Sequence, residues 1–489
     1  MKNTPQDYVA IVNKILPQIE GYLQESMDGK GGVVHQELAS RLSRDLNLNS
    51  WIREGGLSVD NVSSFVKTYL DNSQRMHHPH YIGHQVSSHH LASAVADFIS
   101  GVVNNPMAIY EMGPSSAVIE QTIINWMLEK AGWFLGDSIE DFAEIEGNGS
   151  GVLTHGGSMA NLTAMLAARA RIAPEAWDEG NPGDLVVMGS EVAHYSIARA
   201  ISIIGMGNKN LVTVPTTAME VLRPEYLEER YKQTVDSGKR VMAVVANACA
   251  TSTGLYDPMD EIGQFCNENG LWFHVDGAHG ASALVSDKES HFLSGLDRAD
   301  SMIWDTHKML RTTTLCAAVL FKDAKSLTNT FQQKGSYLFH DKEKPGFDLM
   351  PYTVECTKSG IGTKLFWVLA AEGEKGLEDY IDHQYAITRK FYEIINAHQD
   401  FECPYYPESN IICFRYTSGD DNNEYQLGLR NEMVKRANYY ITSTEVSEVR
   451  YLRLTVINKR TTEDHIRGLL SEIIDISKKI DCTKIDVVI

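Results

Sequence analysis

Two short apolar runs in the middle of the chain each lead into side chains that could do chemistry. Residues 271–275 lead into Asp276, and residues 301–304 lead into a polar cluster that contains His307 and Lys308. Such runs are typical of strands buried on both faces of a parallel sheet, and ligands commonly bind at the carboxyl edge of that sheet. We therefore expect Asp276 and Lys308 to lie close together at one sheet edge.

A carboxylate and a lysine at neighbouring strand ends can form a structural ion pair and nothing more. The residues after Asp276 favour another role, because Gly277, Ala278 and Gly280 leave space for a flat ligand against the backbone. A desolvated lysine such as Lys308 can lose its proton and form a Schiff base. Pyridoxal phosphate needs both groups, an amine for its aldehyde and a carboxylate that keeps its pyridine nitrogen protonated.

The same stretch resembles the group II pyridoxal-phosphate-dependent amino-acid decarboxylases, the family of animal glutamate, cysteine-sulfinate and aromatic-amino-acid decarboxylases. HVDGAHG and the later ADSMIWDTHKML are similar to the family's HVDAA and N-P-H-K motifs. The resemblance makes Lys308 the Schiff-base lysine, Asp276 the partner of the pyridine nitrogen and Ala278 the small residue beneath the ring. It also places His307 at the cofactor.

Three positions depart from the family pattern. Gly277 replaces an alanine, and Asp305 and Thr306 stand where many members carry Asn and Pro. The Asn that Asp305 replaces approaches the cofactor phosphate in the family, and an anion is unfavourable there unless it is turned away or hydrogen-bonded. Some bacterial diamino-acid decarboxylases of the family look similar at this position.

A glycine pair before a predicted helix supplies a candidate phosphate site. A short strand at 152–154 leads into Gly156, Gly157 and Ser158 and then into a strongly helical stretch. Free backbone N–H groups and the positive end of the helix dipole would meet there. A glycine pair alone is weak evidence, but GGSMAN resembles the family's GGAISN, which implies that Gly157, Ser158 and Asn161 bind the cofactor.

Two more strand ends carry residues that the resemblance brings to the cofactor. His194 follows the apolar run at 185–189, where a lone histidine is more often a core or cap residue. SEVAHYSI, however, is similar to the family's SEQSHYS, whose histidine stacks on the pyridine ring. Thr251 follows the apolar run at 241–248 and matches a family threonine that contacts the cofactor near its carboxylate partner.

The substrate side of the site is expected near HHPHYIGHQVSSHH, residues 77–90, which contain six histidines. We do not expect a metal there, because the spacing fits no single helical face and no acidic or cysteine ligand is interleaved. The family has a substrate-facing HPxF/Y segment, which the chain matches at His78, Pro79 and Tyr81. His84 lies where the animal enzymes for acidic amino acids carry Gln, so the resemblance makes it a substrate-side residue.

Two residues come to the site only through the resemblance. Tyr337, in the polar loop 331–348, matches the family's mobile-loop tyrosine, which is presented to the partner subunit's active site and is the expected proton donor to Cα. Arg453, in YLRLTVIN, matches the C-terminal arginine that holds a substrate carboxylate. Otherwise, an arginine that alternates with apolar residues in a strand indicates a surface position.

Composition gives no reason to expect a nucleic-acid or membrane partner. The chain has 489 residues, and its net charge of −20 repels nucleic acid and anionic membrane surfaces. Its seven cysteines are widely spaced and form no CxxC pair, as expected of reduced thiols in a cytoplasmic protein. The chain begins with no signal h-region, and no apolar run approaches the about 18 residues of a membrane helix. We therefore expect a cytoplasmic protein.

The chain is predicted to fold as an α/β protein in three parts. Apolar residues at spacings of three and four predict an N-terminal helical segment at 1–75, which the resemblance assigns to dimerisation. Residues 76–365 are the predicted large cofactor-binding domain, and residues 366–489 are a small α/β C-terminal domain. The resemblance implies the pyridoxal-phosphate-dependent transferase fold of type I, with a mostly parallel, helix-covered sheet. It also implies a homodimer whose active sites are shared between subunits.

The expected activity is the decarboxylation of an L-amino acid to the corresponding amine and CO2. His194, Asp276, Lys308 and Tyr337 are the expected catalytic residues, and the expected substrate is polar, either acidic or diamino. One alternative is an aminotransferase, which shares the aspartate, the lysine and the phosphate cradle. Others are a decarboxylase of aromatic amino acids and an inactive, cofactor-free homologue, for which the three departures are the only support.

Overall fold

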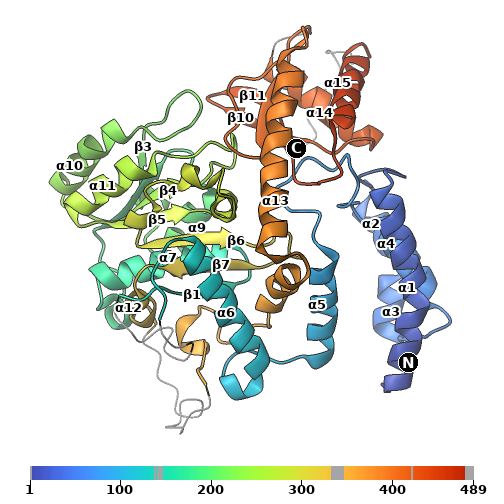
Figure 1. Cartoon of the computed structure of the whole chain (residues 1–489), viewed down its shortest axis with the longest axis horizontal. Helices are drawn as coiled ribbons and strands as arrows, with labels where there is room; N and C mark the ends of the chain where they lie inside the picture. Colours follow the sequence, from blue (N-terminus) through green and yellow to red (C-terminus); the bar gives the residue numbers. More distant parts are fainter. Residues whose placement is uncertain (1–2, 137–138, 140–146, 332–345, 420–421, 480–489) are drawn as a thin grey trace.

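The computed structural model describes residues 3–136, 139, 147–331, 346–419 and 422–479. Its centre is a seven-stranded sheet with the order β1-β7-β6-β5-β4-β2-β3 (Figure 1). Strands β2 to β6 pair in parallel, and β7 is antiparallel to both of its neighbours. The mostly parallel sheet is therefore confirmed. Its strands are β1 (Ser150–Thr154), β2 (Leu185–Ser190), β3 (Leu211–Val214), β4 (Arg240–Asn247), β5 (Trp272–Asp276), β6 (Ser301–Asp305) and β7 (Ala317–Phe321).

The two strands that deliver the expected chemistry are buried along their whole length. Every residue of β5 and β6 is buried, as the apolar runs predict. Each strand extends one residue beyond its run, so that Asp276 and Asp305 are the last strand residues. Asp276 pairs in register with Ile303 of β6. The carboxyl ends of the two strands consequently lie side by side.

Helices cover both faces of this sheet, which gives two cores. Along β4, Val244 and Ala246 face one core, and Ala243 and Val245 face the other, because successive strand residues point to opposite faces. The first core is closed by α6, α10, α11 and α13, and the second by α7, α8, α9 and α12. These helices are α6 (Pro114–Lys130), α7 (Gly157–Ile172), α8 (Ala176–Glu179), α9 (Tyr195–Ile203), α10 (Leu227–Asp236), α11 (Met259–Asn269), α12 (Ala324–Thr328) and α13 (Gly362–Asn396).

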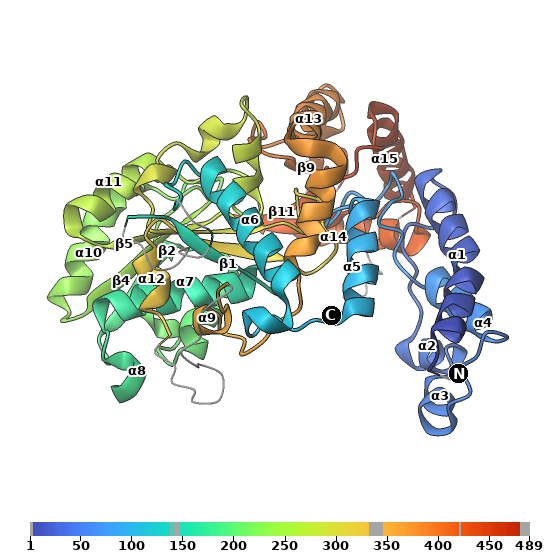
Figure 2. The same ribbon diagram turned by 60° about the horizontal axis from the view of Figure 1, so that its bottom comes forward.

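The N-terminal part is helical, as predicted, and lies at the side of the molecule. Both views show its helices as a separate group next to α5 (Figure 2). Helices α2 and α3 bury none of their residues. The elements are α1 (Pro5–Met27), α2 (Ala39–Asp45), α3 (Leu48–Glu54), α4 (Val62–Asp71) and α5 (Leu91–Val103).

A second, smaller sheet follows α13. It is antiparallel, with the order β10-β11-β9-β8, and packs on α14 and α15. The predicted strand at 411–416 is confirmed, whereas the one predicted at 451–457 lies two residues earlier in the chain. The predicted cap of α15 is confirmed, because Thr462 forms a capping box there. The elements are β8 (Phe401–Glu402), β9 (Ile411–Tyr416), α14 (Asn423–Arg436), β10 (Thr442–Val446), β11 (Val449–Thr455) and α15 (Glu463–Ser477).

Short 3-10 helices connect several of these elements. They are Tyr110–Met112, Asn208–Asn210, Pro224–Tyr226, Gly280–Val285, Ser290–Leu293, Leu296–Arg298 and Met350–Tyr352. Within the described residues, no helix combines the length and the apolar composition that crossing a membrane requires. The division at residues 75 and 365 stays a prediction.

Candidate active site

A cavity of about 420 Å3 lies where β1, β4, β5 and β6 end. It collects residues from seven separate segments of the chain at the carboxyl edge of the sheet, as expected for this kind of fold. Most of the predicted site residues line it, namely His84, Gly157, Ser158, Asn161, His194, Thr251, Asp276, Ala278, His307 and Lys308.

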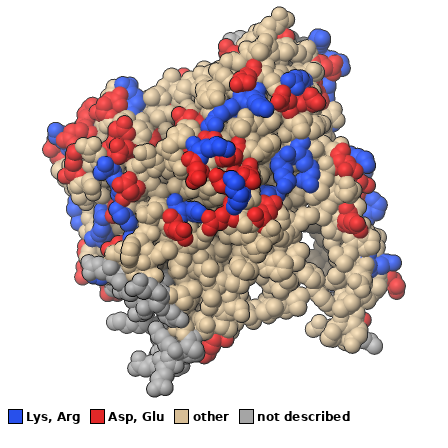
Figure 3. All heavy atoms as spheres, viewed as in Figure 1, with Lys and Arg blue, Asp and Glu red and all other residues tan. Residues whose placement is uncertain are grey.

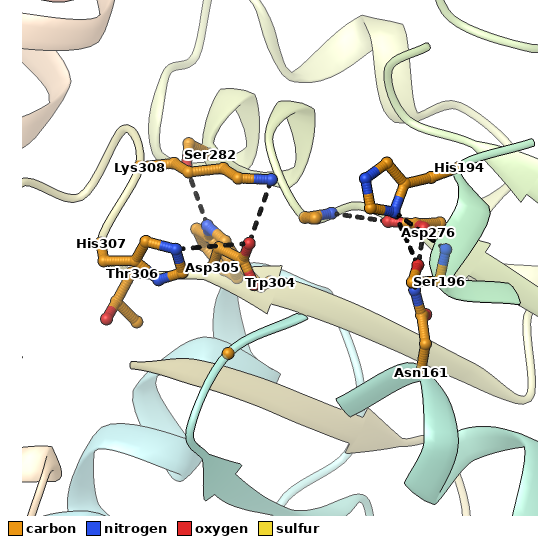
Figure 4. Close-up of polar contacts among 12 residues, drawn as sticks. Asn161, His194, Ser196, Asp276, Ser282, Trp304, Asp305, Thr306, His307 and Lys308 are labelled. Carbon is orange, nitrogen blue, oxygen red and sulfur yellow. Dashed lines mark hydrogen bonds and ion pairs between the residues drawn. The ribbon is translucent and has the colours of Figure 1, made fainter. Parts of the chain in front are cut away.

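Asp276 is fixed by two hydrogen bonds from different elements (Figure 4). The Asn161 side-chain amide donates to its Oδ2 at 2.9 Å, and the Ala278 backbone N–H donates to its Oδ1 at 3.3 Å. The carboxylate is buried but still lines the cavity. Donors on both oxygens stabilise the charged form of a carboxylate, which is the form that would hold a protonated pyridine nitrogen.

Asn161, a predicted cofactor-binding residue, lines the cavity and holds the pyridine-side carboxylate. Its amide contacts Asp276 and also donates to Ser196 Oγ at 2.8 Å. Its oxygen lies 2.9 Å from His274 Nε2, and His274 Nδ1 lies 2.8 Å from Ser301 Oγ. Asn161 therefore positions Asp276.

His274 and Ser196 are residues that the sequence reasoning missed. His274 precedes Asp276 by two strand positions, so both side chains leave the sheet on the same face. That alternation was the available signal. Ser196 had none, because its role depends on the approach of α7 to the start of α9.

His194 caps α9 and lies beside Asp276 (Figure 4). Its Nδ1 lies 2.7 Å from Ser196 Oγ. Burial lowers the pKa of His194, and nearby Asp276 only partly offsets this. The ring is thus neutral at neutral pH, and a neutral flat ring suits stacking on a pyridine.

Lys308 lies on the opposite side of the cavity from His194 and forms an ion pair with Asp305 (Figure 4). The Lys308 Nζ to Asp305 Oδ2 distance is 3.0 Å, and His307 Nε2 is 3.8 Å from the same oxygen. His307 Nδ1 lies 2.8 Å from the carbonyl oxygen of Cys316, which fixes the ring. The predicted proximity of Asp276 and Lys308 is met in the sense that both line one cavity.

The glycine pair lies at the start of α7 and lines the cavity, where the phosphate cradle was predicted. Gly156 has a φ of 106° and caps the helix without a side chain. The first N–H groups of any helix lack intrahelical partners and attract anions. A Cβ at Gly157 would lie 2.8 Å from Asp305 Oδ1, so glycine is required by the close approach of that carboxylate. The cradle, the fixed Asp276 carboxylate and the Lys308 amine fit the phosphate, pyridine nitrogen and aldehyde of pyridoxal phosphate.

Packing accounts for two of the three departures from the family pattern. A Cβ at Gly277 would lie 2.8 Å from both the Ala281 Cβ and the Ile303 carbonyl oxygen, so no alanine fits there. Thr306 is buried and shares a 2.9 Å hydrogen bond with Thr312. The third departure, Asp305, faces the cavity itself.

Two predicted substrate residues are not among those that line the cavity. Tyr81 is 1% exposed and stacks on Tyr440, with 5.8 Å between ring centroids. Arg453 is also buried, and its guanidinium donates to the carbonyl oxygens of Thr251 at 2.7 Å and Ser252 at 3.1 Å. It donates to Gly83 as well, so Arg453 holds the cavity wall from behind.

His84 and Tyr337 complete the predicted set. His84 lines the cavity, and burial followed by the charges of Arg453 and Arg430 lowers its pKa. Tyr337 lies outside the described residues. No group of three or more His, Cys, Asp or Glu residues in the described part of the chain could hold a metal ion.

Comparison with known proteins points to one family. The model of the pyridoxal-dependent decarboxylase conserved domain matches residues 57–417. The chain is 28% identical to acidic amino acid decarboxylase GADL1 of Mus musculus, over 96% of this chain and 87% of that protein. It is 25% identical to L-2,4-diaminobutyrate decarboxylase of Acinetobacter baumannii, over 97% and 93%. The crystal structure of mouse CSAD superposes with a TM-score of 0.88 at 25% identity, over 98% of this chain and 100% of that one.

Proposed function

We propose a substrate class and residue roles for this chain, which belongs to the pyridoxal-dependent decarboxylase family and is an amino-acid decarboxylase that uses pyridoxal phosphate. The proposed reaction converts an acidic L-amino acid to the corresponding amine and CO2. When bound, the cofactor supplies the electron sink for the electrons left at Cα.

The distribution of charge around the cavity carries the substrate proposal. Among the described residues that line it, Asp276 and Asp305 are the only carboxylates, and both lie on the cofactor side. The remaining wall holds His84 and Thr251, with the Arg453 guanidinium directly behind Thr251. A wall without a carboxylate and with a cation behind it favours an acidic side chain over an ammonium group. The name of the GADL1 relatives supports the same class.

Each residue has a proposed task in this reaction. Lys308 would supply the amine that holds the cofactor aldehyde, and Asp276 would keep the proton on the pyridine nitrogen. His194 would cover one face of the ring, and Gly157 and Ser158 would bind the phosphate. Tyr337 gives a proton to Cα after CO2 has left.

Measurement of CO2 release across a panel of amino acids tests the substrate class. We expect turnover of L-aspartate, L-glutamate or cysteine sulfinate, and little or none of L-2,4-diaminobutyrate or L-tryptophan. Diaminobutyrate is the second candidate, because a diaminobutyrate decarboxylase matches almost the whole chain. Turnover of diaminobutyrate alone would contradict the acidic class and leave the decarboxylase intact.

Lys308→Ala tests the site assignment. We expect no decarboxylation and no borohydride-trapped cofactor on the protein, because no other amine is proposed to reach the aldehyde. Mass spectrometry of the reduced wild-type protein should place the pyridoxyl group on Lys308. A pyridoxyl group on a different lysine would contradict the assignment.

We also propose that the active enzyme is a homodimer. The exposed face of α5 is apolar, with Phe98 50%, Val102 58% and Val103 55% exposed. The surface over α5 carries few charged residues (Figure 3). On α1, Val9 is 53% exposed and Leu16 is 50% exposed. Adjacent apolar faces of this kind are typical of subunit contacts, and a second copy of this chain is the proposed occupant.

Complementation between two inactive variants tests the shared site. Tyr337→Phe should still release CO2 but protonate Cα slowly, so that the proton can go to the cofactor carbon instead; hydrolysis then gives aldehyde or ketone and pyridoxamine phosphate in place of amine. Mixing it with Lys308→Ala should restore part of the amine formation, because one site of each heterodimer would carry both intact residues. Normal amine formation by Tyr337→Phe alone would remove Tyr337 from the mechanism.

A further inference from the structure

Asp305 is a buried carboxylate that the proposed reaction does not use. Its side chain is only 4% exposed and ends β6 at the wall of the cavity. One oxygen, Oδ2, pairs with Lys308 Nζ at 3.0 Å. Among the described residues, the other oxygen, Oδ1, has no hydrogen-bond partner. A buried oxygen without a donor is unusual and indicates a group that is missing from its surroundings.

The unpartnered oxygen points at the phosphate cradle. A Cβ built on Gly157 would meet Asp305 Oδ1 at 2.8 Å and Oδ2 at 3.1 Å, so the carboxylate lies directly against the first residue of α7. Gly156, Gly157 and Ser158 line the same cavity. A phosphate bound at this helix start would lie beside Asp305, and two anions in a buried site repel each other strongly.

We propose that Asp305 takes up one proton when the cofactor phosphate enters the cradle. The carboxylate becomes a carboxylic acid with a proton from solvent, and no other bond changes. The O–H of the acid then donates to a phosphate oxygen, while the other oxygen still accepts from Lys308. Cofactor affinity consequently falls as pH rises, through this one residue. The inference depends on the cofactor and not on the substrate class.

Several charged or titratable groups surround Asp305, and Asp305 is the one proposed to take up the proton. Lys308 and His307 follow it in the chain, His194 comes from the turn before α9, and Asp276 comes from β5. From β1, His155 lines the same cavity, and its Nδ1 is 2.9 Å from Glu355. From α7, the part nearest Asp305 is the backbone start of the helix. Lys308 supplies a single positive charge, which cannot balance both the Asp305 carboxylate and a phosphate dianion beside it.

The test compares wild type with Asp305→Asn, which has the same shape and cannot take up the proton. The ligand is pyridoxine phosphate, which carries the phosphate but no aldehyde, added to the full chain freed of cofactor. The dissociation constant is measured by fluorescence from about pH 7 to about pH 9. If binding takes up one proton, the wild-type dissociation constant divided by that of Asp305→Asn should grow about tenfold per pH unit. A ratio that stays constant over this range would overturn the proposal.

Two controls separate the phosphate effect from other ionisations. With pyridoxine, which lacks the phosphate, the ratio should not change with pH, and an equal change would overturn the proposal. Asp276→Asn removes the other cavity carboxylate. In this variant the dissociation constant of pyridoxine phosphate, relative to that of pyridoxine, should depend on pH as it does in wild type. Repeating the comparison in a Lys308→Ala background removes the ionisation of the amine and should give the same tenfold growth.

Calorimetry tests the proposal without any variant. The heat of pyridoxine phosphate binding to the wild-type chain, measured in buffers of different ionisation enthalpy, gives the number of protons taken up. We expect about one more proton per subunit than with pyridoxine at the same pH. Equal proton numbers for the two ligands would overturn the proposal. A failure of the proposed substrate class would change none of these binding results.

Discussion

The two carboxylates of the cavity lie on adjacent strands and have opposite surroundings. Asp276 accepts from Asn161 and from a backbone N–H, and a buried histidine supports that arrangement from behind. Lys308 and His307 both approach one oxygen of Asp305, and its second oxygen has no hydrogen-bond partner among the described residues. Donors on both oxygens stabilise the charged form of a carboxylate, whereas an unfilled oxygen leaves a position for a further partner. The cofactor site thus contains one carboxylate with donors on both oxygens and one with an unfilled oxygen.

The largest effect should come from removing the carboxylate that has donors on both oxygens. Asp276→Asn should lower kcat by about 10²–10³-fold, because the ring nitrogen loses the partner that keeps it protonated. The cofactor should remain bound, since Lys308 and the cradle are unchanged. Absorbance of the bound cofactor and steady-state rates measure the two quantities. Turnover near the wild-type rate would mean that the pyridine nitrogen has a different partner and that Asp276 does not differ from Asp305 in this way.

Lowering the pH should destabilise the fold around Asp276, whereas raising the pH is proposed to weaken cofactor binding beside Asp305. Burial lowers the pKa of His274 from 6.5 to about 4, so the folded protein keeps this ring neutral while the unfolded chain binds a proton. Its contribution to stability is complete above about pH 6.5 and is lost as pH falls to about 4, with a size of ~3 kcal/mol.

Urea unfolding at several pH values measures this loss. His274→Asn, which does not titrate in this range, should lose less stability between pH 6.5 and 4 than wild type does. Equal losses in the two proteins would show that His274 is not the group responsible.

A smaller effect is expected from Asn161→Ala, which removes the amide donor from Asp276. An unsatisfied buried carboxylate oxygen costs about 1–3 kcal/mol, which corresponds to a loss of about 10-fold or more in kcat/KM. Because Asn161 acts through Asp276, the basic limb of the pH profile should also move to lower pH. Asn161→Ser keeps a donor and should recover part of the rate. A rate loss without a shift of the pH profile would indicate a packing defect.

The smallest effect is expected from Ser196→Ala. The hydroxyl lies 2.7 Å from His194 Nδ1 and accepts from the Asn161 amide at 2.8 Å, so its loss loosens both residues. One neutral hydrogen bond contributes about 1 kcal/mol, or about a fivefold change in kcat. The matched change on the other side, Ser158→Ala, should mainly weaken cofactor binding. Equal losses of cofactor affinity in Ser196→Ala and Ser158→Ala would contradict this difference between the Asp276 side and the phosphate side of the site.

The sequence predicted the local parts of this site and missed those that depend on packing between distant segments. Asp276, Lys308 and the glycine pair follow strands or open a helix, so each has a signal within a few residues of itself. The resemblance placed position 305 near the cofactor phosphate, but the direct approach of Asp305 to Gly157 has no local signal, because it arises from the packing of α7 on β6. The packing of Tyr81 against Tyr440 joins parts of the chain that are far apart, and the HPxF/Y motif could not show it.

The large sheet and the small domain also contain features that the sequence predicted and features that it did not. The parallel strands were predictable because their apolar runs are continuous, and β9 was placed without error for the same reason. Arg453 was expected to hold a substrate carboxylate, yet carbonyl oxygens of the 83 and 251–252 segments take up its donors. The sequence cannot show which backbone carbonyl groups will accept these hydrogen bonds, because every residue has one.

Helix α13 joins the two sheets in a way that bears on how the molecule melts. After a kink at Gly373, its second part packs into a core of the large sheet through Leu377 and Ile381, and its last turns pack into the core of the small sheet through Phe391 and Ile395. A helix shared by two cores cannot stay ordered when either core is lost. The two sheets should therefore unfold as one cooperative unit, with a single calorimetric transition whose van't Hoff and calorimetric enthalpies agree.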